Sequence, residues 1–125
     1  MVATDFFRST EEMPNLAPGI HRQRLVVEGT CPQCITEGEI RRYLAGLSDV
    51  CDMRRLIDPV THRSEKFGWA GWVHWEESGA HFYAWETPMI FFSVDIYTCK
   101  PFNPDQVLAF TSSFFQADRI VGKEF

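Results

Sequence analysis

Three consecutive strand patterns, separated only by short turns, occupy the middle of the chain and constrain its fold more than any other feature. Apolar and polar side chains alternate from Phe91 to Cys99, and a second alternating segment runs from His81 to Trp85. A third segment, 69–75, carries bulky aromatic residues on both of its faces. Such short connections suit antiparallel pairing, because a parallel pair needs a crossover of about a dozen residues or more. The middle of the chain therefore predicts an antiparallel sheet, in which the segment 69–75 is covered on both faces.

A helix pattern lies on each side of this region. Thr36 and Glu39 have the spacing of a capping box, and apolar residues recur after them at helical intervals. Asn103 and Pro104 begin a second amphipathic pattern, since asparagine caps helices and proline suits the first helical turn. The predicted buried stripes contain Ile40, Tyr43, Leu44 and Leu47 in the first helix, and Val107, Phe110 and Phe114 in the second.

Shorter strand patterns complete the predicted order of strand, helix, three or four strands, helix and strand. They occur at 24–28, 51–57 and 119–121, and a polar loop is predicted at 58–66. This order is typical of an α+β two-layer sandwich, a mostly antiparallel sheet with two helices on one face. Residues 1–19 show no periodicity and are interpreted as an N-terminal arm, so a single domain is predicted to span residues 20–125.

Composition narrows the classes of function. The net charge of −5 argues against a nucleic-acid-binding protein, because neutralising phosphates requires clustered lysine and arginine. No apolar run approaches the roughly 20 residues of a membrane-spanning helix, and no secretory signal opens the chain, so we expect a cytoplasmic protein without a membrane partner. Aromatic residues make up 14% of the chain, more than a small core needs. Because two helices leave one sheet face bare, the aromatic residues on that face predict a homodimer.

The four cysteines are at positions 31, 34, 51 and 99, and the first two form a CxxC motif. A redox pair would need this motif at the start of a helix that follows a strand. A zinc site would need a second pair at similar spacing, which the sequence lacks. We therefore expect reduced thiols and no metal, and the redox and metal alternatives stay open.

Several segments together resemble the bacterial S-adenosylmethionine decarboxylase family. The family's Glu-Ser bond is matched at the end of the segment Ala70–Ser78, and its following tryptophan is matched by Trp85. A family strand that reads Val-Asp-Val-Phe-Thr-Cys-Gly is matched by Val94–Cys99. The spacing agrees apart from one extra residue between Trp85 and Val94, and the resemblance covers roughly residues 20–122. It implies the family's fold, S-adenosylmethionine as the substrate, and a lyase of polyamine biosynthesis.

The resemblance also implies a cofactor made from the chain itself. Family members cleave themselves at the Glu-Ser bond, here Glu77-Ser78, and the serine becomes a pyruvoyl group. The carbonyl of that group forms a Schiff base with the amino group of the substrate and acts as the electron sink for loss of CO2. A cysteine then returns a proton, and the matching residue is Cys99.

The match differs at the positions that assist self-cleavage. The family's histidine five residues after the serine is Tyr83 here, a second serine eight residues before it is Ala70, and Lys100 replaces the glycine after the Thr-Cys pair. His81, on the same strand face as Tyr83, is a substitute for the missing histidine. A second interpretation therefore stays open, an uncleaved S-adenosylmethionine-binding enzyme that performs elimination or intramolecular displacement with Tyr83, His81 or Glu77 as the base. Further alternatives are a pyruvoyl decarboxylase of a cationic amino acid and a non-catalytic binding protein.

Aromatic residues supply the predicted binding half of the site. A sulfonium over an aromatic face gains about 0.5–2 kcal/mol, and an adenine stacks between rings. The predicted rings are those of Trp85, Phe67 and the segment 69–75, and Glu86 is predicted to accept hydrogen bonds from the ribose hydroxyls. The alternative is that these aromatic residues form the core of the dimer.

Overall fold

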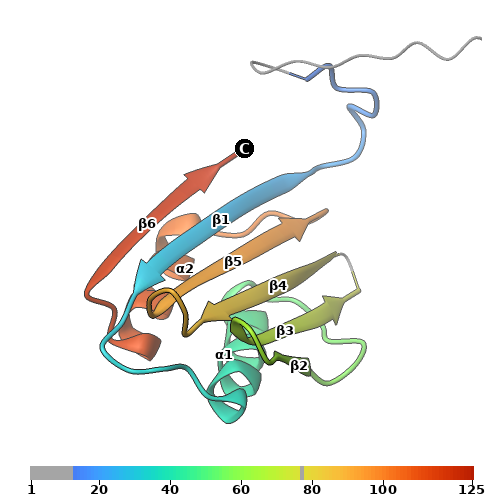
Figure 1. Ribbon diagram of the computed structural model, residues 1–125. Helices are drawn as coiled ribbons and strands as arrows, with labels where there is room; N and C mark the ends of the chain where they lie inside the picture. Colours follow the sequence, from blue (N-terminus) through green and yellow to red (C-terminus); the bar gives the residue numbers. More distant parts are fainter. Residues whose placement is uncertain (1–12, 77) are drawn as a thin grey trace, which may run out of the picture.

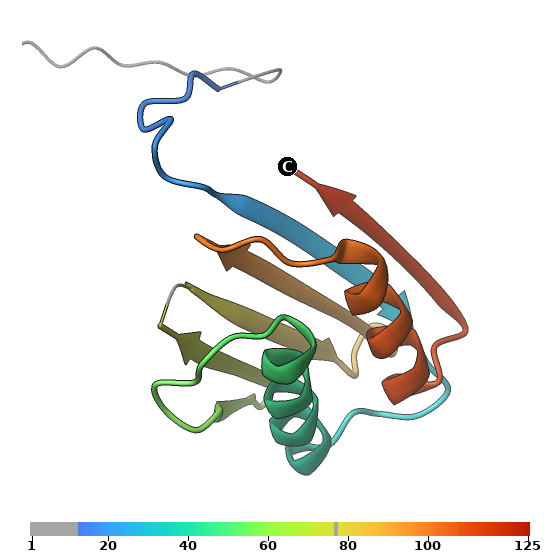
Figure 2. The ribbon, with the colours of Figure 1, turned by 180° about the vertical axis from the view of Figure 1, so that it is seen from behind.

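The computed structural model describes residues 13–76 and 78–125. Residues 1–12, which are most of the predicted arm, and Glu77 of the predicted cleavage bond lie outside the described residues. In the described part, a six-stranded sheet carries both helices on one face (Figures 1 and 2). The predicted α+β two-layer sandwich is confirmed. Among the described residues, no helix is both long enough and apolar enough to cross a membrane.

The elements follow the chain in the order β1 (Gln23–Thr30), α1 (Glu37–Val50), β2 (Val60–Ser64), β3 (Gly68–Trp75), β4 (Ser78–Trp85), β5 (Phe91–Thr98), α2 (Pro104–Phe115) and β6 (Arg119–Glu124). The strands lie side by side in the order β2-β3-β4-β5-β1-β6, and every neighbouring pair is antiparallel. The strands β2 to β5 therefore form a meander, while β1 lies between β5 and β6 (Figure 1).

Both helices begin where the sequence predicts. The Thr36 side chain accepts a hydrogen bond from the Glu39 N–H (3.2 Å), and the Glu39 carboxylate accepts one from the Thr36 N–H (3.1 Å). Asn103 Oδ1 likewise accepts hydrogen bonds from the N–H groups of Asp105 and Gln106. These bonds satisfy backbone donors that a helix N-terminus otherwise leaves without a partner.

The core lies between the helices and the sheet, and Tyr43 of α1 stands at its centre. The predicted stripe of α1 is fully buried. The Tyr43 ring lies 5.3 Å from that of Phe82 on β4 and 4.8 Å from that of Phe115 on α2, measured between centroids. Its hydroxyl oxygen is 2.7 Å from Thr111 Oγ1, and burial raises the pKa of Tyr43, so the phenol stays protonated. Helix α2 buries Val107, Thr111 and Phe115, while Phe110 and Phe114 are half-buried against the same cluster.

One predicted strand is wrong. Residues 51–57 form a turn and an irregular connection, in which Arg55 makes an isolated bridge to Trp75. The strand of this region is β2, which lies in the predicted polar loop and pairs with β3 at the edge of the sheet. An edge strand is held through its backbone, and much of β2 stays in contact with water, so its sequence need not be apolar.

The strands β1 and β6 are longer than predicted. β1 continues through Gly29 to Thr30, because this glycine allows close packing and does not make a turn. A Cβ at Gly29 would lie 2.5 Å from a ring carbon of Phe92. β6 likewise extends beyond Val121 to Glu124, where it pairs with β1 along the edge of the sheet.

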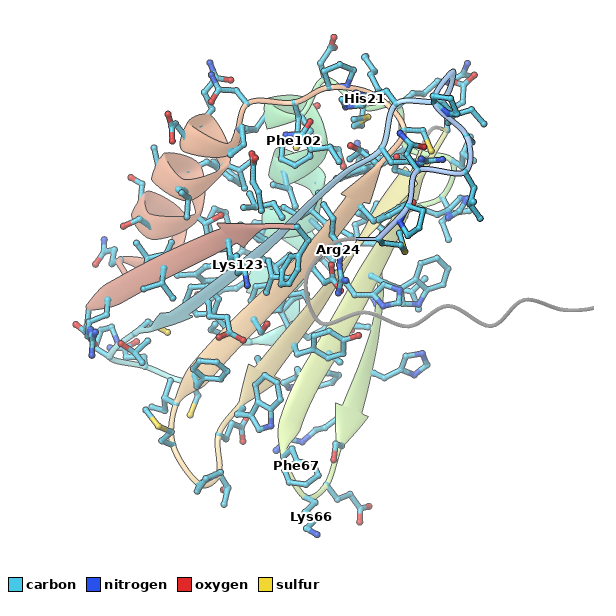
Figure 3. All side chains as sticks on the ribbon, turned by 90° about the horizontal axis from the view of Figure 1, so that it is seen from above. His21, Arg24, Lys66, Phe67, Phe102 and Lys123 are labelled. Atoms are coloured by element: carbon cyan, nitrogen blue, oxygen red, sulfur yellow. The ribbon has the colours of Figure 1, made fainter. Side chains whose placement is uncertain are left out.

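The two faces of the sheet differ in what covers them. One face packs Val73, Phe82 and Val94 under the helices, and all three are buried. The opposite face, here called the open face, has no helix over it (Figure 3). Its side chains include Arg24, Trp72, His81, Tyr83, Trp85, Asp95 and Tyr97. The described residues therefore do not provide the predicted double cover of residues 69–75, since Trp72 is half-buried and His74 is exposed.

Candidate active site

Ser78 and Cys99, 21 positions apart in the sequence, meet at one end of the sheet. Ser78 is the first residue of β4, and Cys99 directly follows β5. Because Ser78 is opposite Thr98 in the register of these strands, the next residue along reaches the serine side chain. The Cys99 N–H donates a hydrogen bond to Ser78 Oγ at 2.8 Å, and the Cys99 side chain is exposed. The structure thus brings together the two residues that the sequence predicted as cofactor source and proton donor.

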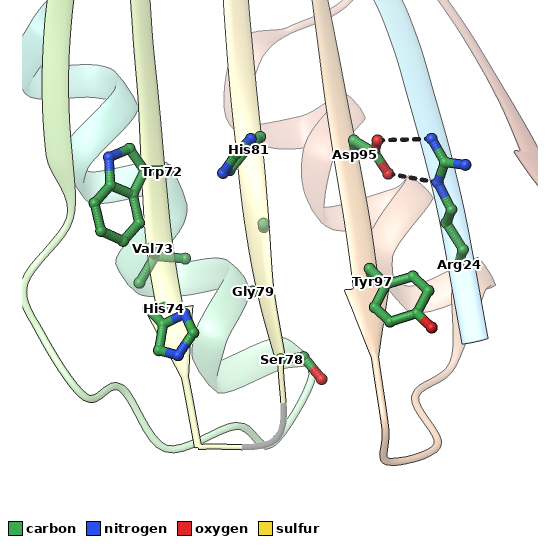
Figure 4. A pocket seen from close by; sticks show the side chains of 10 residues that line it. Arg24, Trp72, Val73, His74, Ser78, Gly79, His81, Asp95 and Tyr97 are labelled. Carbon is green, nitrogen blue, oxygen red and sulfur yellow. Dashed lines mark hydrogen bonds and ion pairs between the residues drawn. The ribbon is translucent and has the colours of Figure 1, made fainter. Parts of the chain in front are cut away.

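A hollow of about 490 Å³ opens on the open face beside Ser78 (Figure 4). Besides Ser78, side chains of Arg24, Trp72, His74, His81, Asp95 and Tyr97 line it. Gly79 lies between His74 and Tyr97 in the strand register, so no side chain fills the space between those two rings. The volume lies within the range of roughly 300–1,000 Å³ that small-molecule sites occupy.

The charged groups of the hollow are paired with each other. Arg24 Nε and Nη2 donate to Asp95 Oδ1 and Oδ2 at 3.0 and 2.8 Å (Figure 4). The hydrogen bonds from Arg24 to Asp95 raise the pKa of the guanidinium, and the Phe125 ring centroid lies 5.0 Å from its central carbon. The hollow therefore presents aromatic and imidazole rings around a neutralised ion pair.

The predicted residues His81 and Tyr83 form a pair on the open face. His81 Nδ1 and the Tyr83 hydroxyl oxygen are 3.2 Å apart. His81 lies opposite Asp95 in the strand register, and Tyr83 lies opposite Ala70. This geometry permits a proton to pass between the imidazole and the phenol.

The predicted binding residues form a second cluster. The Trp85 and Phe91 ring centroids are 5.2 Å apart, and the Glu86 N–H donates to the Phe67 carbonyl at 2.7 Å. The Glu86 carboxylate accepts hydrogen bonds from both terminal nitrogens of Arg63 at 3.1 and 3.2 Å. These bonds lower the pKa of Glu86. A ribose hydroxyl would have to share this carboxylate with Arg63.

The two clusters lie far apart within one chain. Trp85 is seven residues from Ser78 along β4, which corresponds to about 24 Å of extended strand. Figure 3 shows the same separation, with Phe102, just beyond Cys99, at one end of the sheet and Phe67 at the other. A single copy of the chain therefore does not unite all the predicted site residues in one pocket.

Sequence reasoning missed most of the residues that line the hollow. The alternation of β5 placed Asp95 and Tyr97 on the same face as Cys99, which was a usable signal. No local signal indicated that Arg24 lies beside Asp95, because that contact depends on the pairing of β1 with β5.

The two cysteines of the CxxC motif lie between β1 and α1 and differ in exposure. Cys31 is buried and Cys34 is exposed, and both precede the Thr36 cap of α1. Burial raises the pKa of the Cys31 thiol, and it raises that of Cys51 to about 12. All four cysteines lie in the described part of the chain and are free thiols. Residues 13–76 and 78–125 contain no group of three or more His, Cys, Asp or Glu residues that could hold a metal ion.

Comparisons with known proteins agree with the motif. The family model for S-adenosylmethionine decarboxylase matches residues 30–125. A crystal structure of the adenosylmethionine decarboxylase from Aquifex aeolicus VF5 superposes with a TM-score of 0.68, covering 85% of this chain and 89% of that chain at 15% sequence identity. No curated protein matches. At 15% identity, the superposition shows that the two chains share a fold. The match to the family model shows that the chain belongs to the S-adenosylmethionine decarboxylase family.

Proposed function

We propose that the protein is a pyruvoyl-dependent S-adenosylmethionine decarboxylase that cleaves its own chain between Glu77 and Ser78. The family is pyruvoyl-dependent and binds S-adenosylmethionine as its substrate. The observation that carries the proposal is the hydrogen bond from the Cys99 N–H to Ser78 Oγ, beside a hollow of suitable size. This contact between the backbone of Cys99 and the side chain of Ser78 supports their expected roles as proton donor and cofactor source.

The residues at this end of β4 fit a pyruvoyl group. Ser78 is the first residue of β4, so a break before it would leave β4 paired with β5. The pyruvoyl group, once formed, supplies the electron sink for loss of CO2. Cys99, directly after β5, stays next to the position of Ser78 through its backbone N–H, and its exposed thiol is the proposed proton donor.

The hollow suits the cationic substrate. Trp72 and Tyr97 present aromatic faces, which attract a sulfonium through their quadrupoles. Arg24 neutralises Asp95, so this carboxylate is not free to trap a cation tightly in the ground state. We therefore expect the side chains of the hollow to select a ligand by its shape and by its contact with aromatic rings.

We further propose a homodimer that packs open face against open face. The open face exposes Tyr83, at 40%, and Tyr97, at 48%, which is costly for a monomer. In a two-fold interface each contact occurs twice, residue i on j and j on i. An antiparallel pair of this kind would set Trp85 of one copy opposite the Ser78 end of the other, and would unite the two separated clusters. Light scattering that gives a monomer mass at micromolar concentration contradicts this arrangement.

A second candidate is an uncleaved enzyme that performs other sulfonium chemistry in the same hollow. The specific observation in its favour is the pair formed by His81 and Tyr83, at positions where the family's processing histidine is absent. An imidazole and a phenol within 3.2 Å can act as a base in an elimination or an intramolecular displacement. Neither reaction needs an electron sink.

The intact mass of the purified chain separates the two candidates. Self-cleavage yields two fragments, the second of which begins with the modified Ser78 and reacts with borohydride. Release of labelled CO2 from carboxyl-labelled S-adenosylmethionine then tests decarboxylation. An uncleaved chain that converts S-adenosylmethionine without releasing CO2 supports the second candidate and overturns the first.

A further inference from the structure

The connection after β5 is held at several points. We call Cys99, Lys100 and Pro101 the Cys99 loop, which joins Thr98 at the end of β5 to Phe102. The side chain of Cys99 is exposed, and its backbone N–H is the group that reaches Ser78 Oγ. The position of this loop therefore determines whether Cys99 and Ser78 stay together.

Gln23 closes the base of the Cys99 loop. Its Nε2 donates to the Phe102 carbonyl at 3.1 Å, and its Oε1 accepts from the Phe102 N–H at 3.1 Å. A side-chain amide thus makes both hydrogen bonds of a backbone pair with a residue 79 positions away. Gln23 is also opposite Thr98 in the register of β1 and β5. One residue therefore fixes both ends of the loop.

Two further contacts hold the interior of the loop. The buried Thr98 hydroxyl donates to the Lys100 carbonyl at 2.8 Å. Lys100 Nζ donates to the backbone carbonyl of Asp52 at 2.6 Å, and Asp52 Oδ2 lies at 3.4 Å. Asp52 follows α1 in a left-handed conformation (φ 54°), which aspartate tolerates better than most residues. The Cys99 loop is thereby tied to β1 and to the end of α1.

We propose that Gln23 and Lys100 are positioning residues that hold the Cys99 loop so that the Cys99 N–H remains on Ser78 Oγ. A single hydrogen bond contributes little net stability, so the contact with Ser78 alone would not order an exposed loop. The family motif has glycine at the position of Lys100, so the tie to Asp52 is a feature of this chain. The chemical consequence rests on the proposed function, whereas the structural role of the two residues does not.

Hydrogen exchange of the uncleaved chain tests the structural role, because Ser78 Oγ is present only before a pyruvoyl group forms. Gln23→Leu keeps the approximate size and removes both bonds to Phe102, and we expect the Cys99 amide to exchange roughly tenfold faster. Lys100→Met removes the tie to Asp52 and is expected to act in the same direction. Gln106→Leu, on the exposed side of α2, is the matched control and is expected to leave the Cys99 amide unchanged.

Kinetics test the chemical consequence. In both variants we expect kcat for decarboxylation to fall roughly tenfold with KM within about twofold, because the proton donor is misplaced while the hollow is intact. If Gln23→Leu does not fold, two other variants provide the same comparison. They are Gln23→Glu, which keeps the acceptor for the Phe102 N–H, and Lys100→Met.

Unchanged exchange at Cys99 in the folded variants overturns the proposal. Faster exchange with unchanged kcat, or with an equal rise in KM, overturns the positioning role. A wild-type chain that neither cleaves nor decarboxylates contradicts the proposed function, and the exchange result still decides the role of the two residues.

Discussion

The two ends of β4 share one strand and one sheet, yet different interactions build them. At the Ser78 end, a hydroxyl accepts a backbone hydrogen bond beside a hollow that holds a paired Arg24 and Asp95. At the Trp85 end, the Trp85 and Phe91 rings pack at a tilt and Glu86 pairs with Arg63 on the surface. Under the proposed function, the first end supplies the groups that make and break bonds, and the second supplies aromatic rings that contact the ligand. Closeness in the sequence therefore did not place these residues in one pocket.

Removing the Ser78 hydroxyl has the largest expected effect. Because the proposed cofactor is made from the atoms of this serine, Ser78→Ala should abolish both chain cleavage and CO2 release. Intact mass and labelled CO2 are the measurements, and Ser113→Ala on the exposed side of α2 is the control. Cleavage that persists in Ser78→Ala would show that the chemical end of β4 has been misassigned.

Cys99→Ala is expected to come next in size. The alanine keeps the backbone N–H that donates to Ser78 Oγ, so the fold and the serine position should be retained. Loss of a general acid typically lowers the rate by roughly 10²–10⁴-fold, and we expect kcat to fall within that range. Cys34→Ala, also exposed, should match the wild type. A kcat within about twofold of the wild-type value would show that Cys99 is a structural thiol and not the proton donor.

At the other end of the strand, Trp85→Ala should affect binding more than chemistry. Loss of an aromatic face costs roughly 0.5–2 kcal/mol, which corresponds to a KM about tenfold higher with kcat nearly unchanged. Trp85→Phe keeps a ring and should recover most of the affinity. A larger rise in KM for Trp72→Ala than for Trp85→Ala would assign ligand binding to the hollow alone and end the distinction between the two ends.

The smallest expected effect concerns the exposed ion pair of Glu86 and Arg63. Arg63 lowers the pKa of Glu86 below its ordinary value of 4.5, so the pair stabilises the folded state above that pH. This stabilisation is lost as the pH falls through the depressed pKa. Glu86→Gln should therefore lower Tm slightly at pH 7, and the difference from wild type should vanish well below pH 4.5. A difference in Tm that is independent of pH would assign the loss to packing.

Local signals account for most of the fold that the sequence predicted. The capping groups of Thr36 and Asn103 act on backbone N–H groups two or three residues away, so their patterns are readable along the chain. The alternation of β5 is equally local, and its buried side is the predicted one. The edge strand β2 was missed because backbone pairing with β3 forms it, and its side chains carry little apolar signal.

The same difference between local signals and long-range pairing applies to the residues of the candidate site. Ser78 and Cys99 were predicted from a motif, whose spacing is a property of the sequence. The contacts of Arg24 with Asp95 and of Gln23 with Phe102 join positions 71 and 79 residues apart, and only the insertion of β1 beside β5 creates them. The sequence by itself determined the elements, their caps and the motif, because these depend on side chains and backbone groups that are neighbours along the chain. Only the tertiary structure decided which charges are neutralised, where the hollow lies and how far apart the two clusters stand. These properties depend on strand order and register, which arise from the burial of the whole sheet under its helices.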